Sequence, residues 1–278
     1  MRAVVEPLTA LSVDATQSWE ELAARVSAPN PFSEPSMAAP AARGLADGDR
    51  AALLRVVSNG RTVLAVPVVR ERRFRRFPLG TLATWRHAHC CAGEPVVDPG
   101  DAHEAWGAVL DYVVDERIPW LVLQLVYPDS APIAALEEVL AARGLRSHAF
   151  DAYERAVVRK QGQAIAPDEG LSARHRSDLR RKRRGLAKAL GLEPDPTDVL
   201  ADADRVDDAV DAFLALEASG WKGREGTAMA CRTADADFFN INHSKWSNDG
   251  ENNGASACVG AVFKRSRLDR DFGANVHV

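Results

Sequence analysis

The sequence lacks a long hydrophobic run. Its longest apolar stretch, IPWLVLQLVY, covers residues 118–127, whereas a membrane-spanning helix needs about 20 apolar residues. The first residues, MRAVVEPLTALSVDATQ, include Glu6, Pro7 and Asp14 and contain no continuous apolar segment, so they do not have the pattern of a signal peptide. We therefore expect no membrane span and a cytoplasmic location.

Cysteine is scarce, and its spacing argues against the common metal and redox motifs. The four cysteines, at positions 90, 91, 231 and 258, form no C-x-x-C pair, as a zinc ribbon or a thioredoxin-like site would require. Residues 87–91 read HAHCC, but zinc ligand pairs are normally spaced by about two to four residues so that both reach one ion. We interpret this segment as a turn between strands with buried thiols, and we predict no metal site.

A strong charge of one sign is also missing. The formal net charge is -4 over 278 residues, so the chain as a whole does not attract polyanions. Hydrophobic residues make up 46% of the sequence, and a chain of this length can bury a core without disulfides or metal. The bulk properties are those of one large globular domain or two ordinary ones.

Hydrophobic periodicity predicts a mixed α/β layer fold. Asn59 and Gly60 separate two β-branched runs and predict a hairpin. Asp14 and Thr16 are candidate caps for the first helix, and Gly144 is a candidate C-cap. The expected strands are 2–11, 51–57, 62–69, a short strand within 93–100, 119–127 and 153–160, and the expected helices are 14–27, 34–43, 101–117, 129–145, 172–190 and 203–219.

The helix expected at 172–190 is strongly basic. Between Arg174 and Arg184 there are six arginines and one lysine, against a single Asp178. Such a run could hold nucleic-acid phosphates, or the phosphates of CoA or a nucleotide, or it could be a solvated helix face. Arg180 and Arg184 are the candidate phosphate ligands. No aromatic residue interleaves with the basic run, which makes nucleic acid the weakest of these alternatives.

A glycine-rich segment, GWKGREGT, follows the helix expected at 203–219. Its glycines can end that helix and let a ligand approach the backbone, its cations can meet an anion, and its tryptophan can anchor the loop or stack on a substrate. The candidate substrate or cofactor ligands in this segment are Trp221, Lys222, Gly223, Arg224, Gly226 and Thr227. Glu217, just before the segment, is either a general base or an ordinary helix residue.

Four segments in order carry a family resemblance: WEELAARVSAPNPFSEPSM, HAHCCAGEPVVDP, RHRSDLRRKRRGL and FLALEASGWKGREGTAM. Over residues 1–239 the chain resembles the CelD-like acetyltransferases of the GNAT superfamily, which are associated with cellulose biosynthesis, and distantly the FemAB-type transferases. The resemblance implies a tandem GNAT-like fold, with one domain over 1–165 and the start of a second over 166–239. It also implies transfer of an acetyl or acyl group from acyl-CoA to an amine or hydroxyl by direct attack.

The composition changes after Phe239. Residues 240–278 contain six asparagines, against two in residues 1–239, and a single leucine, Leu268. Only residues 255–263 could form a strand there. Since the family would build its second sheet and its pyrophosphate loop in this region, we interpret 240–278 as an atypical tail from a frameshift or a disordered segment, which leaves the second domain incomplete.

Three functions follow from these observations. The first is a GNAT-type N-acetyltransferase that uses acetyl-CoA or another acyl-CoA and acts on a small molecule or a cell-envelope or polysaccharide precursor. The second is a FemAB-like transferase that uses aminoacyl-tRNA. The third is an inactive remnant or binding module. The resemblance provides no nucleophile or general base that can be assigned to a residue here.

Overall fold

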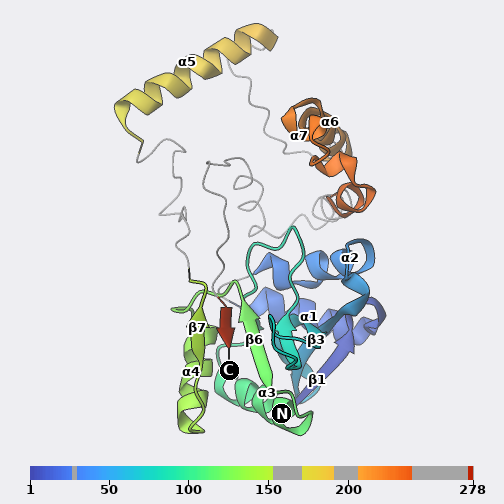
Figure 1. The fold of residues 1–278 in the computed structure, drawn as a ribbon, viewed down its shortest axis with the longest axis vertical. Coiled ribbons are helices and arrows are strands. Elements are labelled where there is room, and N and C mark those ends of the chain that lie inside the picture. The colour runs from blue at the N-terminus through green and yellow to red at the C-terminus, as the bar shows by residue number, and fades with distance from the viewer. Residues whose placement is uncertain (27–29, 153–170, 191–205, 240–274, 278) are drawn as a thin grey trace. The chain divides into compact units, whose positions relative to one another are not determined.

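The computed structural model describes residues 1–26, 30–152, 171–190, 206–239 and 275–277 (Figure 1). Contacts between residues divide the chain into two compact units, one made of residues 1–153 with 207–278 and the other of residues 154–206. Each unit is described by itself below. The domain boundary that the resemblance implies at residue 165 stays a prediction, as does the tandem arrangement.

The first unit is a mixed α/β structure built on one sheet with the order β1-β2-β3-β4-β6-β8-β7, in which β5 pairs with β3. Neighbours along this path are antiparallel except β4 and β6, which are parallel. In Figure 1 the short red arrow of β8 lies between β6 and β7. The strands are β1 (Arg2–Pro7), β2 (Ala51–Ser58), β3 (Arg61–Glu71), β4 (Thr81–Thr84), β5 (Val96–Val97), β6 (Trp120–Gln124), β7 (His148–Phe150) and β8 (Asn275–His277).

The hairpin predicted from Asn59-Gly60 is confirmed. β2 and β3 pair up to Ser58 and Arg61, and the two turn residues have φ angles of 50° and 81°. Both angles lie in the left-handed region that a two-residue hairpin turn requires, which asparagine tolerates and glycine adopts freely.

Helices cover both faces of the sheet because successive strand residues point to opposite sides. On β6, Leu121 and Leu123 belong to one buried cluster and Val122 belongs to the other. The first cluster includes residues of α3 and α4, and the second includes residues of α1 and α2. These helices are α1 (Val13–Arg25), α2 (Pro35–Gly44), α3 (Ala102–Asp115) and α4 (Ala131–Ala142).

Several expected boundaries change in the structure. Ser12, and not Asp14 or Thr16, caps α1, because the backbone amide of Ala15 donates to its hydroxyl at 3.1 Å. The long apolar run expected as one strand forms only β6, since Leu125 leaves the sheet with a φ of 56°. Arg143 is the C-cap of α4, and Gly144, the expected cap, comes directly after it with a φ of 68°. The expected strands at 153–160 and 255–263 lie outside the described residues.

Further described helices are α5 (Ala173–Leu190), α6 (Val206–Ser219), α7 (Trp221–Arg224) and a helical segment at residues 233–239. On α6, Val210 and Leu214 are buried, whereas Leu216 is 72% exposed because it lies off the stripe that they define. Within the described part of the chain, none of the helices combines the length and the apolar character that crossing a bilayer requires.

Candidate active site

The segments that follow β4 and β6 lie at the same end of the sheet, here called its carboxyl edge because the carboxyl ends of both strands lie there. Thr81 of β4 is paired with Trp120 of β6 and the two strands are parallel, so their carboxyl ends point the same way. Ligands of open α/β sheets bind beyond the carboxyl ends of such strands. The residues after β4 include the HAHCC segment, and those after β6 include Tyr127 and Ser130.

Asn30 anchors the loop that carries this segment. Its side-chain nitrogen donates to the carbonyls of Ala92 (3.3 Å) and Glu94 (2.7 Å) and to the hydroxyl of Ser33 (2.9 Å). Gly93 crosses the end of β6 so closely that a Cβ would lie 2.1 Å from the Gln124 carbonyl oxygen. The loop is therefore fixed against the sheet at this edge.

His89 forms a hydrogen bond with a carboxylate from the far end of the described chain. Its Nε2 lies 3.1 Å from Asp235 Oδ1, and its ring stacks on Phe238 with centroids 5.1 Å apart and an interplanar angle of 20°. Residues 233–239 are helical, so one helical turn presents both partners. Because a carboxylate only accepts, the bond places the proton on Nε2 and leaves Nδ1 with a lone pair.

His87 is buried and neutral. It is 8% exposed, and neither ring nitrogen has a hydrogen-bond partner among the described residues. Its ring packs against Trp85 (5.1 Å between centroids) and the edge of Phe238 (5.5 Å). Burial, and secondarily the charge on His89, lowers the pKa of His87 to about 4. A buried polar group without a hydrogen-bond partner lowers the stability of the folded protein, so its presence here suggests a role other than stabilising the fold.

Two further buried groups at this edge lack a partner. Glu94 Oε1 and Ser130 Oγ make no hydrogen bond of good geometry among the described residues, although the Ser130 hydroxyl is close enough to lower the pKa of Glu94; Glu94 Oε2 accepts from the Tyr127 amide at 2.9 Å. Burial raises the pKa of Glu94, opposed by its neighbours Ser130 and Tyr127. His87, Glu94 and Ser130 account for all but one of the buried side-chain atoms without a partner in the described chain, the other being Thr62 Oγ1. Such atoms therefore concentrate at the edge where a ligand of this fold class would bind.

The arrangement can accept a proton next to an apolar surface. The side chain of His89 is 25% exposed and that of Asp235 is 14% exposed, so the imidazole is reachable while its carboxylate partner is largely shielded. A base oriented by a carboxylate is the arrangement that general-base catalysis uses. From the sequence we interpreted HAHCC as a turn only. The available signal was a His-x-His pair directly after a strand.

The glycine-rich segment forms a closed turn after α6. Gly220 begins α7, which contains Trp221, Lys222, Gly223 and Arg224, and the amide of Thr227 donates to the Lys222 carbonyl at 2.8 Å. Gly226 has a φ of 67°. The structure thus brings the six candidate ligands of this segment together in one turn.

Glu217 organises this turn. Its side chain is 7% exposed, Oε1 pairs with Lys222 Nζ and Oε2 accepts from the Met229 amide at 2.8 Å. Gly223 packs on the preceding helix, because a Cβ there would lie 1.7 Å from the Ala218 carbonyl oxygen. The backbone that lies close to Gly223 is therefore that of α6 and not that of a ligand. Both carboxylate oxygens of Glu217 are already bound, one to Lys222 and the other to the Met229 amide.

Arg180 and Arg184 lie on α5 in the second unit and are exposed. On the same helix, Asp178 pairs with Arg181 at 2.6 Å and with Lys182 at 2.8 Å. These cations, Lys182 first, lower the pKa of Asp178 to about 2. The helix predicted from the sequence is confirmed, and Arg180 and Arg184 are exposed on it.

The thiols of the HAHCC segment are more accessible than we expected. Cys90 is half-buried and Cys91 is exposed, because the segment passes beyond the end of the strand. Among the residues that the structure describes, no group of three or more histidine, cysteine or carboxylate side chains could hold a metal ion.

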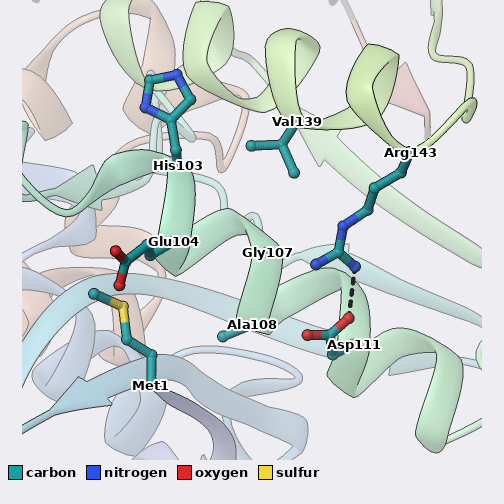
Figure 2. Close-up of a pocket in the computed structure, with 8 residues that line it drawn as sticks. All are labelled: Met1, His103, Glu104, Gly107, Ala108, Asp111, Val139 and Arg143. Carbon is teal, nitrogen blue, oxygen red and sulfur yellow. Dashed lines mark hydrogen bonds and ion pairs between the residues drawn. The ribbon is translucent and has the colours of Figure 1, made fainter.

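Figure 2 shows a groove of about 360 Å³ between α3 and α4, away from this edge. Some of its charged groups are paired: Arg143 donates to Asp111 at 2.5 Å, and His103 pairs with Glu138 at 2.6 Å. These pairs leave fewer charged groups free to bind a ligand there. The residues lining it are Met1, His103, Glu104, Gly107, Ala108, Asp111, Val139 and Arg143.

No protein-family model matches the chain, and no curated protein matches it. Among solved structures, one titled "Crystal structure of FemX" is similar, with 15% sequence identity and a TM-score of 0.47. The alignment covers 90% of this chain and 56% of that chain, so the present chain spans little more than half of FemX. A likeness of this size has no bearing on function.

Proposed function

We propose that this chain is a transferase that moves an acyl group from acyl-CoA to an amine or a hydroxyl, with His89 as the proton acceptor. The observation that carries the proposal is the bond between His89 and Asp235 at the carboxyl edge of β4 and β6. The resemblance of residues 1–239 to GNAT-type acetyltransferases supplies the reaction class. The acceptor is a small molecule or a glycan precursor, and the reaction belongs in the cytoplasm.

The chemistry needs a base and no covalent enzyme intermediate. An ammonium group of the acceptor gives a proton to His89 Nδ1, and the freed lone pair attacks the thioester carbonyl. A carbon–nitrogen bond forms, the carbon–sulfur bond breaks, and the CoA thiolate leaves and takes up the second proton that the attacking nitrogen loses. Asp235 holds the imidazole in the tautomer that can accept.

His87 keeps the surroundings of His89 apolar without adding charge. Its low pKa keeps the ring neutral, so it does not repel a cationic acceptor. Loop 220–227 is the proposed phosphate ligand for the donor, whereas Arg180 and Arg184 of α5, in the second unit, stay candidate phosphate ligands from the sequence alone.

The test is a thiol-release assay with acetyl-CoA and a panel of amines and amino sugars, run beside thermal unfolding. A donor at a hundredfold excess over its Kd stabilises the folded chain by ~2.7 kcal/mol. Release that depends on His89 and a raised melting temperature support the proposal. A cooperative transition that acetyl-CoA does not move, with no thiol release, would show an inactive remnant or binding module.

A second donor class has an observation of its own in its favour. Helix α5 carries eight basic residues against Asp178, which suits an aminoacyl-tRNA. Binding of tRNA with a steep salt dependence, together with transfer from charged tRNA but not from acyl-CoA, would replace the first donor by the second.

A further inference from the structure

The connection between β3 and β4 displays charge and apolar surface together. Residues 72–79, here called the arginine tip, read RRFRRFPL and contain no acidic residue. Phe77 is 62% exposed and Leu79 is 37% exposed, with the exposed Pro78 between them. Single exposed apolar residues are ordinary, but adjacent ones surrounded by arginines mark an interaction surface.

The arginine tip has a defined shape. Phe74 and Phe77 exchange two backbone hydrogen bonds of 3.0 and 2.9 Å, which close a turn over Arg75, whose φ is 51°. A non-glycine residue in this region costs energy and persists where surrounding contacts hold it.

Contacts to the first unit hold the tip in place. The Phe74 ring stacks on Trp120 with centroids 5.9 Å apart and an interplanar angle of 17°, and Arg75 pairs with Asp151. Phe77 and Leu79 are therefore displayed from an anchored base.

Three guanidinium groups of the tip have no ion-pair partner among the described residues: those of Arg72, Arg73 and Arg76. By contrast, Arg70 just before the tip pairs with Glu116 at 2.8 Å. The tip therefore combines uncompensated positive charge with exposed Phe77 and Leu79.

We propose that the arginine tip docks this protein on an anionic phospholipid surface. Basic residues are drawn to anionic headgroups, while aromatic and aliphatic side chains enter the interface between headgroups and acyl chains. A single-stranded nucleic acid would use the arginines and Phe77, but Pro78 and Leu79 offer no surface for base stacking. The lipid surface is the partner that uses every exposed group of the tip.

The experiment is co-sedimentation of the full chain with vesicles of phosphatidylcholine alone and with 30% phosphatidylglycerol. We expect binding only to the anionic vesicles, weakening as salt is raised from 0.1 to 1 M. Phe77→Ser with Leu79→Ser should weaken the partition coefficient by roughly tenfold or more. Arg72→Gln, Arg73→Gln and Arg76→Gln should weaken it by roughly fivefold each.

Two matched control variants test whether vesicle binding is specific to the arginine tip or is non-specific binding by exposed apolar or basic side chains. Val13→Ser with Val114→Ser removes two side chains that are 81% and 69% exposed elsewhere. Arg2→Gln, Arg43→Gln and Arg146→Gln together remove the same charge from exposed positions elsewhere in the first unit. Both should bind the anionic vesicles as the unchanged chain does. The proposal would be overturned if the unchanged chain did not bind vesicles or bound neutral vesicles equally well. It would also be overturned if a control variant lost binding, or if the tip bound single-stranded RNA and not vesicles.

Discussion

The imidazole of His89 and the carboxylate of Asp235 are 146 positions apart in the chain, and their Nε2 and Oδ1 atoms lie 3.1 Å apart. The second carboxylate oxygen is 3.5 Å from Arg232 Nη1, so Asp235 is held from both sides. In this pair Asp235 orients the imidazole of His89, the proposed base, which lies in the loop after β4 at the carboxyl edge of the sheet.

Replacing Asp235 with Asn should lower kcat for transfer by roughly a hundredfold while leaving KM near its original value, because the base loses its orientation and not its substrate. Steady-state thiol release measures both constants. The matched control is Glu138→Gln, which removes the carboxylate partner of the exposed His103 and should leave both unchanged. Equal rates for Asp235→Asn and the original chain would contradict the role of Asp235 in orienting His89.

Replacing His87 with Leu should make the protein more stable in mild acid. The pKa of His87 falls from about 6.5 to about 4 on folding. The unfolded chain therefore takes up this proton first, and the original protein loses about 3 kcal/mol of stability as pH falls from about 6.5 to about 4. Above pH 6.5 the ring is neutral in both states and this loss disappears.

Urea unfolding at a series of pH values checks this prediction. His87→Leu should remove that part of the pH dependence and raise stability at neutral pH by about 1 kcal/mol, since it deletes two buried polar atoms without partners. His103→Leu, at an exposed position, is the control and should keep the slope. An unchanged slope in His87→Leu would mean that His87 is solvated in the native state.

Replacing Glu217 with Ala should destabilise the turn after α6. The change leaves the Met229 amide without its acceptor and Lys222 without its partner, which costs about 1 to 3 kcal/mol. Hydrogen exchange of residues 220–229 should accelerate. Glu225→Ala, at an exposed position, is the control. If Glu217→Ala abolished transfer without changing exchange, Glu217 would be the base that the sequence left open.

Replacing Gly223 with Ala should separate α6 from the turn that follows it. The new methyl group would overlap the Ala218 carbonyl oxygen, at 1.7 Å, so the backbone must shift at a cost of several kcal/mol. Gly185→Ala is the contrast, because no atom lies within 4 Å of the added Cβ, and alanine in an exposed helix interior stabilises by about 0.5 to 1 kcal/mol. Thermal unfolding and circular dichroism of both variants test whether the glycine serves packing.

Local patterns in the sequence predicted the elements and missed the contacts between distant ones. The hairpin at Asn59-Gly60 and the helix that contains Pro40 follow from turn chemistry and periodicity, which act over a few residues. The pairing of His89 with Asp235 depends on how a helix after α7 packs on the loop after β4. No periodicity encodes that packing. The exposed Cys91 was missed for the same reason.

The position of β8 sets an order of events in folding. Residues 275–277 fill the place between β6 and β7, and they are synthesised long after residues 148–150. Until they arrive, the facing edges of β6 and β7 present unpaired backbone groups, the kind of edge that recruits other chains. Completing this sheet needs a contact of high sequence separation, which folds slowly. The nascent first unit should therefore depend on chaperones at the ribosome, and its yield should fall when they are limiting.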